Sequence, residues 1–95
     1  MTKADLVQEI SKTTGIEKQL VSKILETYME QLKSNMIQGQ NIFFRGFGSF
    51  TLKKRAEKAA RNISKNTTVV IPAHYIPVFK PCDEFKKEVA EKVKD

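Results

Sequence analysis

The chain has 95 residues, the size of one small domain, and we treat residues 1–95 as a single unit. Its 17 Lys and Arg outnumber 11 Asp and Glu, giving a net charge of +6, and the mean hydropathy of −0.41 comes without an apolar run long enough to span a membrane. The first residues are polar, which predicts no secretory signal, and the single Cys82 cannot form an internal disulfide, so we expect a reducing, cytoplasmic location.

The beginning of the chain predicts a helical hairpin. Thr2 and Asp5 have the spacing of a capping box, apolar residues follow at helical intervals, and Gly15 is typical of a helix end. One apolar stripe then runs from Val21 to Met36 and closes at Gly39, which predicts a second helix of about four turns. Because the connection between the two is short, we expect them to be antiparallel.

From residue 41 the apolar pattern changes to a period of two. Residues 41–45 and 49–53 are typical of two strands around a turn. Gly46 and Gly48 lie in that turn, and we expect both to supply unusual backbone angles.

A further strand is predicted from Thr67 to Val78. Pro72 and Pro77 lie within it, so parts of it should be edge or bulge positions. Pro81 then breaks the chain before a last short helix with an acidic first turn, which suits the helix dipole. The predicted fold class is therefore α+β, with an N-terminal helical hairpin, a three-stranded antiparallel sheet and a C-terminal helix.

Most of the net charge lies in one short segment. Residues 53–65 carry six Lys and Arg against Glu57 alone, whereas the rest of the chain is nearly balanced. A charge run is ordinarily a solvated surface, but this one has only alanines and Ile63 as apolar residues, so nothing in it can anchor it to a core. Residues 62–66 are typical of a turn between two strand-like flanks, which predicts a protruding β-ribbon arm over about residues 53–68.

The arm should be long and weakly held. Ten residues of strand span about 33 Å, which exceeds the radius of gyration of about 13 Å for a domain of this size. An isolated two-stranded ribbon is only marginally stable in water, so we expect it to be mobile until it binds.

The remaining body has more apolar side chains than so small a scaffold can cover. Oligomerisation is the usual solution, and a two-fold dimer is its commonest form. The residues predicted for the dimer core are Leu32, Phe44, Phe47, Phe50 and Phe79.

Several short motifs together resemble the HU and integration host factor family of bacterial nucleoid-associated proteins, over residues 1 to about 92. They are Gly46-Phe47-Gly48-Ser49-Phe50, Arg55, Arg61-Asn62, Ile71-Pro72-Ala73 and Pro77-Val78-Phe79-Lys80-Pro81. The resemblance implies an intertwined dimer whose arms enter the DNA minor groove, where an apolar residue at each tip wedges between base pairs. HU and integration host factor are themselves established examples of this mode of binding.

The charge pattern and the resemblance together indicate the residues that contact DNA. The candidates are Lys53, Arg55, Lys58, Arg61, Asn62, Ile63 and Lys65 on the arm, and Lys3, Lys80 and Lys86 on the body. Ile63 stands where the family usually has Pro and is the predicted intercalating residue, although it lacks the fixed φ of Pro. Its alternative is a turn residue folded back on its own ribbon.

Other chemistry finds little support in the sequence. His74 and Cys82 alone do not make a zinc site, and no nucleophile stands with a base, so we expect no metal, no cofactor and no enzyme. Phe47 and Phe50 are expected in the core, with base stacking as the alternative.

The function predicted from the sequence is a nucleoid-associated architectural protein. It should bend and compact double-stranded DNA with little sequence specificity, as a homodimer or as a heterodimer with a paralogue. The alternatives left open are site-specific bending, an RNA-binding module, and a scaffold that grips an acidic protein.

Overall fold

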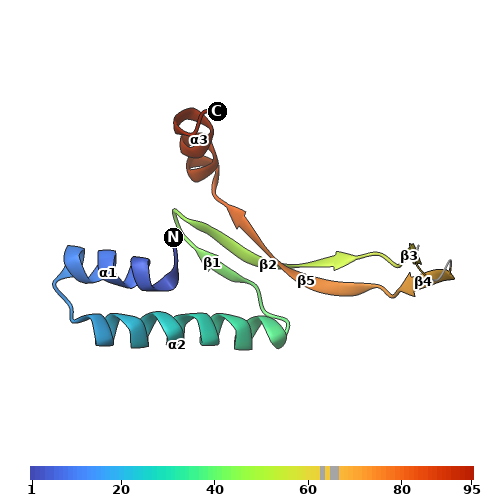
Figure 1. The fold of residues 1–95 in the computed structure, drawn as a ribbon, viewed down its shortest axis with the longest axis horizontal. Helices are drawn as coiled ribbons and strands as arrows, with labels where there is room; N and C mark the ends of the chain where they lie inside the picture. Colours follow the sequence, from blue (N-terminus) through green and yellow to red (C-terminus); the bar gives the residue numbers. More distant parts are fainter. Residues whose placement is uncertain (63, 65–66) are drawn as a thin grey trace. The chain divides into compact units, whose positions relative to one another are not determined.

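A computed structural model describes residues 1–62, 64 and 67–95, and it divides them into two units, residues 1–37 and the remainder from residue 38. The described chain has three helices and antiparallel strands, which confirms the α+β class (Figure 1). The elements are α1 (Lys3–Thr14), α2 (Lys18–Ile37), β1 (Ile42–Phe44), β2 (Gly48–Arg55), β3 (Lys58–Asn62), β4 (Thr67–Ile71), β5 (His74–Pro81) and α3 (Asp83–Lys92).

The first unit is the predicted helical hairpin. The backbone N–H of Thr2 donates to the carboxylate of Asp5 at 2.9 Å, and the Thr2 hydroxyl accepts from the N–H of Asp5, so the capping box is confirmed. Gly15 ends α1 with a φ of +76°, and its N–H donates to the Ser11 carbonyl at 2.8 Å. None of the described helices is long and apolar enough to cross a membrane.

The second unit contains a three-stranded antiparallel sheet in the order β1-β2-β5. Ile42 pairs with Phe50, and Phe50 pairs in turn with Phe79. β1 is shorter than residues 41–45, and β2 continues two residues beyond the predicted end at 53. The register between β2 and β5 is unbroken from Gly48 to Arg55, so side chains alternate regularly between the two faces over that whole length.

The two turn glycines serve different purposes, which corrects the expectation that both supply unusual angles. Gly46 has a φ of +79°, a conformation that favours glycine. Gly48 has no positive φ, but a Cβ there would lie 2.5 Å from the Lys80 carbonyl oxygen and 2.8 Å from the Phe79 ring. Glycine is required at 48 because neighbouring β5 backbone and an aromatic ring leave no space for a side chain.

The predicted strand from 67 to 78 is wrong in one respect, because it is two strands. β4 ends at Ile71, β5 begins at His74, and Pro72 lies in the interruption. Since proline has no backbone N–H, Pro72 cannot donate a hydrogen bond to the opposite strand, and the ladder is interrupted there. β5 then extends to Pro81, and Pro77 is tolerated inside it because β5 is an edge strand of the three-stranded sheet.

β3 and β4 pair along their whole lengths and form a separate two-stranded antiparallel ribbon. Lys58 pairs with Ile71 and Asn62 pairs with Thr67. This ribbon follows directly on the paired ends of β2 and β5, where Arg55 pairs with His74. The structure therefore places two paired segments in succession along the predicted arm (Figure 1).

Few side chains of the described chain are buried. Val7, Val21 and Met36 are the buried hydrophobic residues, all of them on the helices. The aromatic residues of the second unit form a connected cluster, with ring-centroid distances between 4.9 and 6.3 Å, that remains partly exposed; its members are Phe44, Phe47, Phe50, Phe79 and Phe85. A single chain thus leaves a large share of its apolar surface in contact with water.

Candidate nucleic-acid interface

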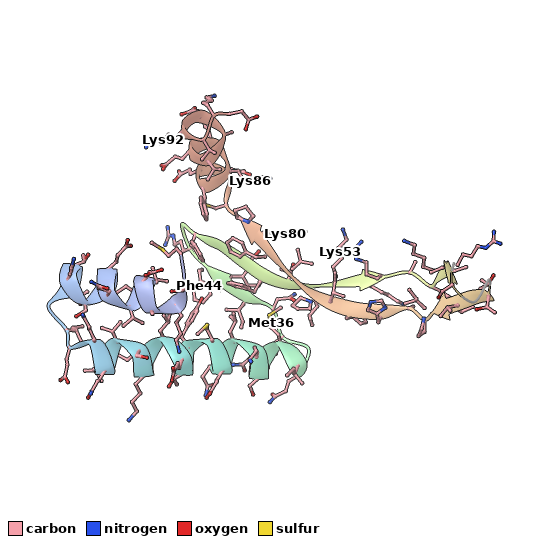
Figure 2. All side chains as sticks on the ribbon, viewed as in Figure 1. Met36, Phe44, Lys53, Lys80, Lys86 and Lys92 are labelled. Carbon is pink, nitrogen blue, oxygen red and sulfur yellow. The ribbon has the colours of Figure 1, made fainter. Side chains whose placement is uncertain are left out.

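The aromatic cluster lies on one face of the sheet, and three of the predicted DNA-contacting cations lie on the other. Alternation along β2 places Phe50 and Leu52 on one face, and Ser49, Lys53 and Arg55 on the other. We call the second the cationic face; it is built from Phe43 on β1, Ser49, Thr51, Lys53 and Arg55 on β2, and His74, Ile76, Val78 and Lys80 on β5. Three predicted DNA contacts, Lys53, Arg55 and Lys80, therefore share one face, and Figure 2 labels Lys53 and Lys80.

The cations that lead into the arm are exposed and uncompensated. Lys53, Lys54, Arg55 and Lys58 are all exposed, and within the described residues none of them forms a salt bridge or a side-chain hydrogen bond. An uncompensated run of this kind produces a strong positive potential, which attracts phosphates. Lys54 faces away from the cationic face, so the charge is presented on both sides of the arm.

The distal ribbon carries the remaining arm candidates. Arg61 is exposed on β3 opposite Thr68, and Asn62 is the last residue of β3. Ile63 and Lys65 lie outside the described residues, so the predicted intercalation by Ile63 remains a prediction.

The same ribbon exposes apolar side chains that sequence reasoning did not single out. Val69 and Val70 are opposite the small residues Ala60 and Ala59, and Val70 is 57% exposed. Two strands cannot cover either of their own faces, so these side chains remain in water until another surface covers them.

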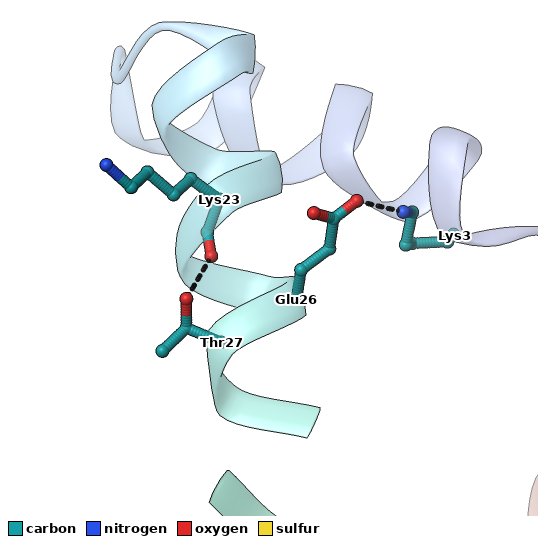
Figure 3. Close-up of polar contacts among 4 residues, drawn as sticks. All are labelled: Lys3, Lys23, Glu26 and Thr27. Atoms are coloured by element: carbon teal, nitrogen blue, oxygen red, sulfur yellow. Dashed lines mark hydrogen bonds and ion pairs between the residues drawn. The ribbon is translucent and has the colours of Figure 1, made fainter. Parts of the chain in front are cut away.

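The three body candidates differ in their surroundings. Lys80 is exposed on β5 and Lys86 is exposed on α3. Lys3, by contrast, forms an ion pair with Glu26 of α2 (Figure 3), and this ion pair lowers the pKa of the Glu26 carboxyl. The charge of Lys3 is thus already partly compensated within the hairpin, which makes it the weakest of the three as a phosphate ligand.

The five predicted dimer-core residues are only partly covered by their own chain. Leu32, Phe44, Phe50 and Phe79 are half-buried, and Phe47 is 43% exposed. Phe47 and Phe50 belong to the aromatic cluster and lie with Phe79, which agrees with the core reading rather than with base stacking.

Phe43 is an exposed aromatic residue that the sequence did not single out. It is 74% exposed and lies between two half-buried neighbours on β1. Since three consecutive apolar residues in a strand cannot all face the same side, the sequence showed that Ile42, Phe43 and Phe44 are divided between two faces, but not which face is exposed.

No group of three metal-ligating side chains comes together anywhere in residues 1–62, 64 and 67–95. The pair of His74 and Cys82 weighed in the sequence analysis belongs to no such cluster in that part of the chain.

Known proteins match this chain over nearly its full length. Residues 1–90 match the family model described as "Bacterial DNA-binding protein". The chain is 40% identical to integration host factor subunit beta of Hahella chejuensis over 95 residues, covering 99% of this chain and 97% of the relative. It is 33% identical to DNA-binding protein HU of Thermotoga maritima, covering 94% and 99%.

The fold also matches solved structures over nearly the whole chain. A cocrystal structure of Anabaena HU with DNA superimposes with a TM-score of 0.89 at 28% identity, covering 95% of this chain and 98% of that one. The V42I mutant of HU from Thermotoga maritima gives a TM-score of 0.71 at 29% identity, covering 94% and 99%. On this agreement of family model, relatives and fold, the chain belongs to the bacterial DNA-binding proteins of the HU and integration host factor family.

Proposed function

We propose that this chain is an architectural DNA-binding protein that bends and compacts duplex DNA as a dimer, with little sequence preference. The observation that carries the proposal is the continuous series of exposed cations from the cationic face into the paired arm. Lys53, Arg55 and Lys58 have no carboxylate partner within the described residues. The phosphates of DNA carry the negative charge that would neutralise such a surface.

The shape of the arm favours the minor groove. A two-stranded ribbon with Ala59 and Ala60 on its outgoing strand is thin, and its exposed valines can lie against sugars while Arg61 reaches phosphates or base edges. The minor groove distinguishes A·T from G·C pairs but little else, so binding there supports weak sequence preference. Preference should instead follow deformability, with flexible, nicked or pre-bent DNA bound more tightly.

A second copy of the chain would cover the apolar surface that one copy leaves exposed. The aromatic cluster is partly exposed, and the hairpin carries an apolar groove lined by Ile10, Ile16, Val21, Ile24, Leu25 and Tyr28. Covering surface of this kind is the main source of stability in dimers of small subunits. Dimerisation also supplies two arms, which a clamp around DNA requires.

One finding favours a second function within the same class. Integration host factor subunit beta is 40% identical to this chain, a higher identity than that of HU from Thermotoga maritima. That relative is named as a beta subunit, and other relatives are named as alpha subunits. The alternative function is therefore that of a heterodimer that bends DNA at preferred sites. Competition between random and selected duplexes separates the two readings, because only a site-specific bender discriminates strongly between them.

We also propose that the protein acts in the cytoplasmic nucleoid and that it catalyses no reaction. A protein of this kind works on the chromosome, in the cytoplasmic nucleoid, and its contribution is mechanical: it stabilises a bent DNA path without changing a covalent bond.

The experiment is bending of a short duplex labelled with a donor and an acceptor at its two ends. The wild-type protein should bring the ends closer, and Ile63→Ala should lose much of that bend while it keeps salt-dependent binding, because only the wedge is removed. Ser64→Ala, a change at the next residue in the sequence, is the control and should bend DNA as the wild type does. An unchanged bend with Ile63→Ala would reject the wedge, and a wild-type protein that neither binds nor bends duplex DNA would overturn the function.

A further inference from the structure

An exposed phenylalanine on the cationic face has no role in the architecture described above. Phe43 lies on β1, opposite Ser49 of β2, and Ser49 is in turn opposite Lys80 of β5. These three residues form one row across the sheet, with a small polar side chain between an aromatic ring and an ammonium group. Two strand spacings separate the backbones of Phe43 and Lys80, which is about 10 Å.

The position of Phe43 sets it apart from the other aromatic residues of the sheet. Phe44 and Phe50 face the opposite side, where their ring centroids are 6.1 Å apart. Phe43 makes no ring contact of this kind within the described chain and is 74% exposed. It therefore adds nothing to the aromatic cluster, and its neighbours across β2 on its own face are the hydroxyl side chains of Ser49 and Thr51, with Lys80 one strand further.

An aromatic ring beside cations on an open sheet is suited to one kind of ligand. Every nucleobase has a flat apolar surface, and stacking on an aromatic side chain is insensitive to sequence. The bases of an intact duplex are stacked on one another and offer no open surface, whereas an unpaired base does. A base stacked on Phe43 would leave its phosphate within reach of the long Lys80 side chain.

We propose that Phe43 is a stacking platform for an unpaired base in bound DNA, with Lys80 holding the adjacent phosphate. This inference rests on the proposed DNA-binding function and adds a second binding element outside the arms. It gives the protein a direct means to favour bulged or gapped DNA, beyond the lower cost of bending such DNA.

The test compares a duplex that contains one unpaired 2-aminopurine with the fully paired duplex of the same sequence, at one salt concentration. Stacking should quench the fluorescence of the 2-aminopurine in the wild-type complex. Phe43→Leu keeps apolar volume but removes the aromatic face, so the ratio of affinities for bulged and paired DNA should fall about tenfold and the quenching should be lost. Phe43→Tyr keeps the ring and should keep both.

Tyr75 offers a matched control. It is 64% exposed and pairs with Lys54, so it is an open aromatic residue beside a cation on the other face of the same sheet. Tyr75→Leu should leave the affinity ratio and the quenching unchanged.

Three results would overturn the inference. One is an unchanged affinity ratio in Phe43→Leu, and another is an equal loss in Tyr75→Leu. The third is sedimentation of Phe43→Leu as a monomer, which would mean that a second copy of the chain covers this ring. A wild-type protein that binds neither duplex would instead refute the DNA-binding function itself, so the two failures are distinct.

Discussion

The salt dependence of DNA binding tests the assignment of the cationic face most directly. Lys53 is exposed on that face, has no carboxylate partner within the described residues, and points away from the aromatic cluster (Figure 2). Lys53→Gln removes the charge and leaves a shorter polar side chain in its place. In a homodimer one substitution removes two cations, so the change is doubled.

The size of the effect follows from counterion release. Each neutralised phosphate contributes a slope of about −0.9 to the plot of log affinity against log salt, so Lys53→Gln should make the slope shallower by about 1.8. Between 50 and 200 mM salt the variant should therefore lose about 12-fold less affinity than the wild type, whose loss should be about 10³–10⁵ for six to ten phosphate contacts. Fluorescence anisotropy of a labelled duplex over a salt series measures both slopes.

A control of equal charge separates contact from net charge. Lys23 is exposed on α2, outside the sheet and the arm, and Lys23→Gln removes the same two charges from a dimer (Figure 3). Its slope should match that of the wild type. Equal slopes for Lys53→Gln and the wild type, or equal changes in both variants, would show that Lys53 does not contact phosphate and that the face has been assigned wrongly.

Two further predictions concern stability. Gly48→Ala should destabilise the protein by about 1–3 kcal/mol in urea unfolding, because the added Cβ meets the Lys80 carbonyl and the Phe79 ring; wild-type stability in the variant would contradict that packing. Hydrogen bonds from Thr2 lower the pKa of Asp5, and Lys3 lowers the pKa of Glu26. Both carboxylates therefore contribute stability above their unfolded pKa values near 4, and this is lost as the pH falls through the folded values. The double variant Asp5→Asn/Glu26→Gln should melt below the wild type at pH 7 and together with it at pH 2, and a constant difference in Tm across that range would contradict the ion pair and the cap.

The two ends of α1 were predictable because each is determined by residues next to it. Thr2 and Asp5 satisfy one another's backbone and side-chain groups, and Gly15 adopts the left-handed conformation that few other residues accept. Such signals depend on neighbours three or four residues away, which the sequence displays directly. The helical hairpin therefore follows from local chemistry alone.

The details of the sheet depend on contacts between distant residues. Nothing next to Gly48 shows that the Phe79 ring and the Lys80 carbonyl, more than 30 residues later, lie against it. The break at Pro72 is a similar case, because a proline interrupts a ladder only where its missing N–H faces a partner strand. The exposure of Phe43 likewise depends on which face of β1 meets the aromatic cluster, and the pattern of three apolar residues does not decide it.

The arm of the candidate site was predictable for a different physical reason, namely that its residues cannot form a buried core. A segment with six cations and only alanines and one isoleucine has no means of burying itself, so it must remain in water or lie against a polyanion. Its strand pairing with β4 and β5 makes it extended, and its uncompensated charges make it costly to leave without counterions. Both properties are unfavourable in a protein core and suit a ligand of DNA, so the arm could be predicted from composition, whereas the exposure of Phe43 could not.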